Sequence, residues 1–155
     1  MQAYADDLAV AERQARALRG QPGGPPDSPE RRAELDALRA CVARNVDREC
    51  VALDLMANEL EARQAQEIDG RVAALLVGDV DLSERPDELS ARVAACHAAA
   101  TDTERAASEN ELRDFVRGAV TREITALRTR AERLRADTPA ETSRRVEQLL
   151  ARRHK

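Results

Sequence analysis

Residues 35–60 have the sequence LDALRACVARNVDRECVALDLMANEL, in which apolar residues recur at spacings of three and four. This spacing puts the apolar side chains on one face of an α-helix and the charged side chains on the other. The pattern continues through residues 68–76, so the sequence predicts one long helix over 28–78. Such a helix would be about 75 Å long, which is typical of coiled coils, with any kink expected at Asp69-Gly70. The apolar stripe consists of Leu35, Leu38, Val42, Val46, Cys50, Leu53, Ala57, Leu60, Ile68, Val72, Leu75 and Leu76.

The segment before the long helix predicts a first helix and a loop. Residues 2–19 carry apolar side chains at helical spacing, whereas residues 20–29 contain three glycines and four prolines, which favour a loop. At the end of the loop, Asp27 can cap the long helix, Pro29 suits its first turn, and Glu30 completes a capping box.

After the long helix, acidic and turn-forming residues at 79–86 predict a connection to a second long helix over 86–137. The apolar stripe of this second helix is weak in the middle, where Thr101 and Glu104 form a possible capping box. A break near residue 101 is therefore an alternative to one continuous helix.

A short basic helix is predicted at the end of the chain, over residues 139–153. Thr138, Pro139 and Glu141 supply a cap, a first-turn proline and the acid of a capping box in the expected order.

The order of these helices predicts an all-α fold in which residues 1–155 form a single domain. Two long helices joined by a short turn run antiparallel, so we expect a long hairpin that resembles a coiled coil. The short helices at the two ends of the chain would pack at the open end of the hairpin and complete a four-helix base. The rest would project as a two-helix stalk of Ala and Val, which buries little and is expected to pair with a second copy or a partner.

Aromatic residues are scarce, because Tyr4 and Phe115 are the only ones and the chain has no Trp. Rings supply much of the buried area of a globular core and most of the walls of a ligand pocket. Here the apolar residues are mainly Ala, Leu and Val, which fill the stripes of helices. We expect both rings in the four-helix base and an interaction role for the chain.

Residues able to carry out catalysis or bind a metal do not form a recognisable set in the sequence. Cys41 and Cys50 lie nine residues apart, which puts them on opposite faces of a helix and roughly 13 Å apart along its axis. Cys96 and His97 are adjacent and diverge, and His154 stands next to the end of the chain. We therefore predict no catalytic, cofactor-binding or metal-binding residue.

The sequence also predicts a location in the cell. It contains neither an apolar run long enough to span a membrane nor a signal peptide, and its three cysteines show no pairing pattern. We expect a soluble, cytoplasmic protein.

Charge is distributed unevenly along the chain, although the net charge of -4 is modest. Residues 116–155 contain eleven Arg or Lys and five acids, whereas residues 47–69 contain seven acids and two arginines. The basic segment could hold phosphates of a nucleic acid, or it could complement an acidic helix in the same protein or in a second copy.

These features favour a non-enzymatic helical scaffold, adaptor or assembly subunit that self-associates and binds a protein partner. One alternative is a nucleic-acid-binding protein that uses the arginine-rich last helix, and another is a helical-bundle enzyme that holds an anionic metabolite with inward-facing arginines. The candidate partner-binding residues are Phe115, Arg144, Arg145, Leu149, Arg152 and Arg153.

Overall fold

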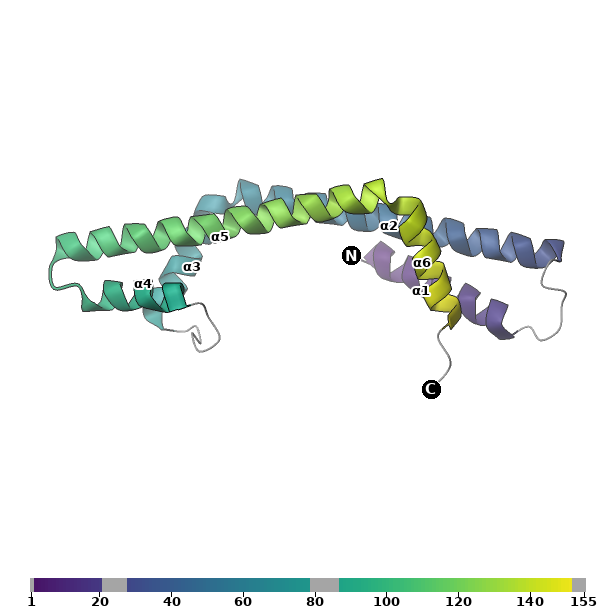
Figure 1. Ribbon diagram of the computed structural model, residues 1–155, viewed down its shortest axis with the longest axis horizontal. Helices are drawn as coiled ribbons and strands as arrows, with labels where there is room; N and C mark the ends of the chain where they lie inside the picture. The colour runs from purple at the N-terminus through teal and green to yellow at the C-terminus, as the bar shows by residue number, and fades with distance from the viewer. Residues whose placement is uncertain (1, 21–27, 79–86, 152–155) are drawn as a thin grey trace. The chain divides into compact units, whose positions relative to one another are not determined.

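The computed structural model describes residues 2–20, 28–78 and 87–151, and these ranges contain helices and no strand. The expectation of an all-α fold is confirmed. None of the described helices is both long and apolar enough to cross a lipid bilayer. In chain order the helices are α1 (Gln2–Gly20), α2 (Pro29–Ala62), α3 (Gln64–Val77), α4 (Asp87–Ala98), α5 (Asp102–Ala136) and α6 (Thr138–Ala151) (Figure 1).

The chain divides into two compact units, each with its own apolar cluster. Unit 1 combines Met1–Leu55 with Arg128–Lys155, and unit 2 is the continuous segment Met56–Leu127. Helices α2 and α5 therefore contribute residues to both units, while the other helices each belong to one.

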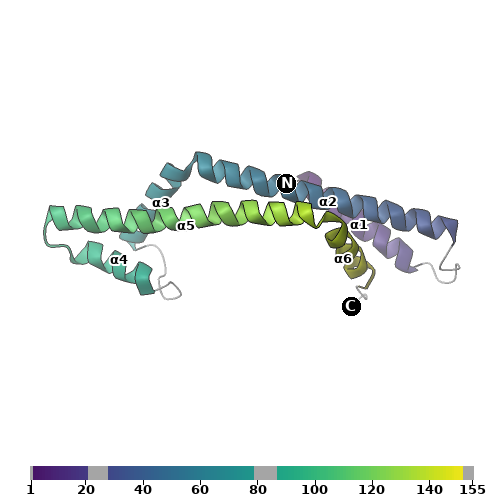
Figure 2. The ribbon, with the colours of Figure 1, turned by 45° about the horizontal axis from the view of Figure 1, so that its top comes forward.

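Unit 1 is built around α2, on which α1 and α6 pack while also contacting each other (Figure 2). Small alanines on α1 let it approach closely, and aliphatic residues of α2 and α6 fill the remaining space. The side chain of Tyr4, expected in this region, lies outside the described residues. The buried cluster consists of Ala11, Ala15 and Leu18 of α1, Leu38, Cys41 and Val42 of α2, and Val146 and Leu149 of α6.

Both cysteines of α2 are buried, with Cys41 1% and Cys50 2% exposed. Their nine-residue spacing places them about 180° apart around the helix, as the sequence predicts. Both can be buried because the covered face of α2 spans about half of its circumference here, from Cys41 at one edge to Cys50 at the other. Thus α2 is packed by partners on more than one side.

Unit 2 is more than a pair of helices, so the expectation of a bare two-helix stalk is wrong. Helix α4 folds back along the beginning of α5, and α3 packs against α4 (Figures 1 and 2). Phe115, which we expected in the four-helix base, packs against this second cluster instead. The cluster consists of Ala57, Ile68, Val72, Leu75, Leu89, Val93, Cys96, Leu112, Val116, Val120 and Ile124.

The segment predicted as one helix over 28–78 is interrupted at Arg63, and the expected kink at Asp69-Gly70 is absent. Arg63 has φ -105° and ψ 12°, and α3 begins at the next residue. A reason lies in the apolar stripe, which shifts by about 80° around the helix between Leu60 and Ile68. The interruption lets both segments face the same cluster, whereas Gly70 stays helical in open space.

Helices α4 and α5 are separate, so the alternative with a break near residue 101 is the one observed. The capping box predicted there is confirmed. The backbone N–H of Glu104 donates to Thr101 Oγ1 at 3.2 Å, and Glu104 Oε2 accepts from the backbone N–H of Thr101 at 3.0 Å. The same carboxylate accepts from the N–H of Ala100 at 3.0 Å, which fixes the turn into α5.

We expect Thr101→Ala to lower the free energy of unfolding by about 1 kcal/mol, because the first turn of α5 loses its side-chain acceptor. Urea unfolding followed by circular dichroism measures this loss. Thr101→Ser keeps the hydroxyl and should retain most of the stability. Equal losses in both variants would contradict the role of the cap.

Ser28 caps the start of α2, because its Oγ accepts a hydrogen bond from the backbone N–H of Arg31 at 3.2 Å. The cap predicted at Asp27 lies outside the described residues.

Candidate functional site

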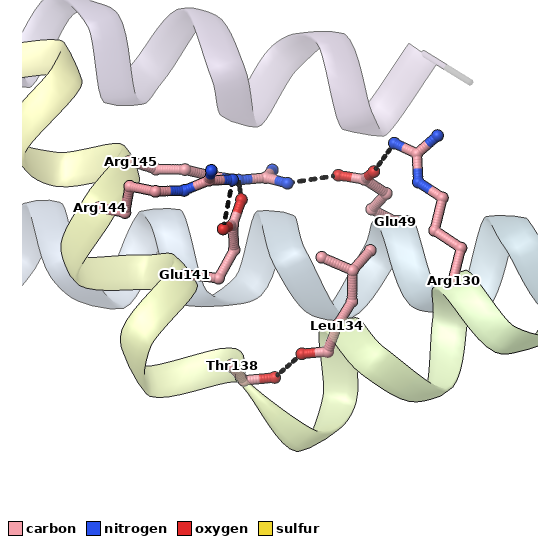
Figure 3. A network of polar contacts seen from close by, with 7 residues as sticks. All are labelled: Glu49, Arg130, Leu134, Thr138, Glu141, Arg144 and Arg145. Atoms are coloured by element: carbon pink, nitrogen blue, oxygen red, sulfur yellow. Dashed lines mark hydrogen bonds and ion pairs between the residues drawn. The ribbon is translucent and has the colours of Figure 1, made fainter.

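Helix α6 follows α5 after a single residue, Asp137. The Thr138 hydroxyl donates to the carbonyl oxygen of Leu134 at 2.8 Å (Figure 3). It also lies 3.2 Å from the carbonyl oxygen of Arg135. Thr138 therefore supplies a hydrogen-bond donor to the last carbonyl groups of α5. The prediction that it caps α6 is wrong. The reason is the short connection, which makes Thr138 the first residue of α6 and leaves it no room for the extended backbone of a cap.

Three helices meet near this junction in a network of charged side chains (Figure 3). Arg145 of α6 binds Glu49 of α2 through Nη2 at 2.8 Å and Glu141 of its own helix through Nε at 2.6 Å. Glu49 also accepts from Arg130 of α5 at 2.7 Å. Arg144 binds the second oxygen of Glu141 at 2.6 Å.

The acids are the most buried members of this network. The Glu141 side chain is 11% exposed and that of Glu49 is 15% exposed, against 24% for Arg145. Arg130 and Arg144 are about two-thirds exposed and approach from the solvent side. Because each buried carboxylate contacts two guanidinium groups, its negative charge is compensated by hydrogen-bonded partners.

The pKa values of the α6 residues move in the direction that keeps them charged. Hydrogen bonds from Arg144 and then Arg145 outweigh burial and hold the pKa of Glu141 below its usual range. Burial disfavours the charge of Arg145, but hydrogen bonds to Glu141 and Glu49 prevail and raise its pKa. General acid catalysis requires a carboxyl group with a raised pKa, so Glu141 suits a structural role.

Acidification should weaken unit 1 because the pKa of Glu141 is lower in the folded state than in the unfolded state. Its contribution to stability is fully present above the unfolded pKa and is lost as the pH falls through the folded pKa. We expect the urea concentration at the midpoint of unfolding to decrease as the pH is lowered below about 5. Glu141→Gln should flatten this dependence, and an unchanged pH profile in that variant would contradict the assignment.

Two polar side chains are buried beside the network, Asn45 at 3% exposure and Thr142 at 9%. Among the described residues, Nδ2 of Asn45 and Oγ1 of Thr142 have no hydrogen-bond partner. Such groups oppose folding, so the charged network and the apolar cluster must outweigh their cost.

The predicted partner-binding residues do not form one exposed surface. Leu149 is buried in the cluster of unit 1, and Arg145 is held by the two acids. Arg144 is exposed, while Arg152 and Arg153 lie outside the described residues. Phe115 is half-buried in unit 2.

Phe115 also contacts a cation, because the guanidinium carbon of Arg92 lies 5.2 Å from the centre of its ring. This geometry fits a cation–π interaction that holds α4 to α5. The ring thus has a packing role within unit 2.

Sequence reasoning missed a group of exposed apolar side chains on α2. Val51, Leu55 and Met56 are each more than half exposed. They lie outside the main apolar stripe of α2. In the sequence, only the four-residue spacing of Val51 and Leu55 indicates that they share a second face of the helix.

Unit 2 has its own polar contacts between helices. Arg71 of α3 binds Glu123 of α5 at 3.0 Å, and Arg113 of α5 binds Asp69 of α3 at 3.0 Å. These pairs are largely exposed, so they orient the helices and add little stability.

A pocket of about 250 Å³ opens between α4 and α5 of unit 2. None of its lining residues is a histidine or a cysteine, and within the described chain no group of three or more His, Cys, Asp or Glu could hold a metal ion. The pocket is lined by Glu88, Ala91, Arg92, Ala95, Ser108 and Glu111.

Comparison with known proteins finds no matching family model, no curated protein with significant similarity and no solved structure that matches.

Proposed function

We propose that the protein is a non-enzymatic helical scaffold or assembly subunit, which self-associates and binds a protein partner through its long amphipathic helices. The observation that carries this proposal is the exposure of Val51, Leu55 and Met56 on α2, at 56%, 57% and 56%. Three large apolar side chains close together on the exposed face of one helix are a feature of surfaces that bind another protein.

The surroundings of α6 favour a protein-binding role over the nucleic-acid alternative. Arg145 is engaged by two carboxylates, and Arg144 is paired with Glu141. A phosphate backbone would have to compete with these acids for both guanidinium groups. The nucleic-acid alternative would be favoured if the protein bound a labelled duplex, if salt weakened this binding, and if the double variant Arg144→Ala/Arg145→Ala lost it.

For the fold, we propose that unit 1 acts as the four-helix base expected from the sequence. It includes α1, α6, the first part of α2 and the end of α5. The ion pairs of Arg130 with Glu49 and of Arg135 with Asp54 support the contact between α5 and α2 in this unit. The long hairpin remains a prediction, which distances between spin labels on α2 and α5 would test.

A cytoplasmic location is also part of the proposal. In the part of the chain that the structure describes, Cys41, Cys50 and Cys96 are buried and form no disulfide, which fits a compartment that keeps thiols reduced.

Sedimentation velocity tests self-association on the purified chain, at concentrations from about 5 to about 500 µM. We expect the average mass to rise with concentration, and Leu55→Glu to reduce the rise because it places a charge in the exposed apolar group. A wild-type chain that stays monomeric throughout this range would contradict self-association.

A further inference from the structure

Six neighbouring residues of α2 form one exposed surface, which we call the α2 seam: Arg48, Val51, Ala52, Leu55, Met56 and Glu59. All six belong to one unbroken helix. At 100° per residue they cover an arc of about 140°, with Arg48, Ala52, Leu55 and Glu59 along its middle. Their spacing of four, three and four residues is that of a helix-pairing seam.

The α2 seam is complementary to itself when it is reversed. A two-fold axis between positions 53 and 54 places Arg48 against Glu59 of a second copy, and Glu59 against its Arg48. The same axis sets the small Ala52 against the large Leu55, and Val51 against Met56. Each contact thus joins opposite charges, a small residue with a large one, or two apolar residues.

We infer that the occupant of the α2 seam is a second copy of this chain, whose α2 packs antiparallel on the first. This inference rests on the self-association proposed above and specifies its surface, direction and register. A parallel, in-register pair is disfavoured because it would set Arg48 against Arg48 and Glu59 against Glu59.

The expected dimer is weak. From Arg48 to Glu59 the α2 seam is about 17 Å long, and its apolar centre contains four residues from each copy. Such a contact lies below the area of roughly 1,200 Å² that stable complexes bury, so we expect a dissociation constant in the micromolar range or weaker.

Charge reversal tests this arrangement. Arg48→Glu creates two Glu–Glu contacts across the antiparallel pair, and Glu59→Arg creates two Arg–Arg contacts. Each variant alone should self-associate roughly tenfold more weakly than the wild type. An equimolar mixture of the two should recover association as a heterodimer, because both of its charged contacts are then Glu–Arg. The double variant Arg48→Glu/Glu59→Arg should recover as a homodimer.

Sedimentation velocity measures the association constants, and native mass spectrometry of an isotopically labelled and an unlabelled variant identifies the heterodimer. Arg122→Glu and Glu132→Arg, at exposed positions of α5, are the matched controls and should behave as the wild type alone and mixed. Ala52→Glu gives a second route, since it places a carboxylate at the centre of the seam while both charged partners remain.

The outcomes separate the two proposals. Wild-type association with no effect of Arg48→Glu, Glu59→Arg or Ala52→Glu would overturn the α2 seam and leave self-association standing. Weakened single variants without recovery in the mixture would overturn the antiparallel register. A wild type that is monomeric at every concentration would overturn both the seam and self-association.

Discussion

Leu112→Ala is expected to lower the free energy of unfolding by about 3 to 5 kcal/mol. Leu112 lies in the cluster of unit 2 with 0% of its surface exposed, and its removal leaves a cavity as well as losing apolar burial. The residues of this cluster come from α2, α3, α4 and α5, which limits how far the site can collapse. Urea unfolding followed by circular dichroism measures the change.

The matched control is Leu55→Ala, which makes the same chemical change at a side chain that is 57% exposed. It should alter the free energy of unfolding by no more than about 0.5 kcal/mol. Similar losses in Leu112→Ala and Leu55→Ala would contradict the placement of Leu112 in a core.

The rate at which a thiol reagent labels each buried cysteine reports on the two units separately. Cys50 lies in unit 1 and Cys96 in unit 2, and burial raises the pKa of both, so that neither is reactive until its surroundings open. We expect Leu112→Ala to accelerate the labelling of Cys96 more than that of Cys50.

The second large effect is expected at Arg145. Arg145→Leu should lower the free energy of unfolding by about 2 kcal/mol, because Glu49 loses one of its partners and Glu141 loses another while both carboxylates stay largely buried. This loss is smaller than that for fully buried pairs, because Arg130 and Arg144 still approach the acids from solvent. Chemical unfolding of unit 1 gives the value.

A double-mutant cycle with Glu49→Gln isolates the contact between Glu49 and Arg145. The two losses should be less than additive, with a coupling energy of about 1 kcal/mol. Arg133→Leu is the control, since this exposed side chain of α5 lies outside the network and its replacement should leave the unfolding midpoint nearly unchanged. Strict additivity of Arg145→Leu and Glu49→Gln would show that the two residues act independently.

Helical class and the capping box before α5 could be predicted because they depend on residues close together in sequence. Apolar spacing needs only neighbours within two turns, and Thr101 and Glu104 are three residues apart. The same local rule failed at Thr138, because its hydroxyl had an equally close alternative in the carbonyl groups at the end of α5.

Features that depend on distant residues could not be predicted in this way. The stripe of α2 does not show that Glu49 accepts from Arg145, which lies 96 residues further along the chain. Likewise, the break at Arg63 depends on where the cluster of unit 2 lies, and a glycine at position 70 gives a stronger local signal for a kink than an arginine does. The prediction that Phe115 lies in the four-helix base was wrong, because nothing in the apolar stripe of α5 indicates that α4 folds back along this helix.

The discontinuity of unit 1 imposes an order on the folding of the chain during synthesis. Residues 56–127 leave the ribosome as one uninterrupted segment and contain the whole cluster of unit 2, so this unit can fold before α6 has been made. The residues at the amino end are synthesised first, yet they must wait for α6 to supply Val146, Leu149 and Arg145. Until then Leu38 and Val42 lack part of their cover, and this interval is when a nascent chain is most exposed to chaperones and to aggregation.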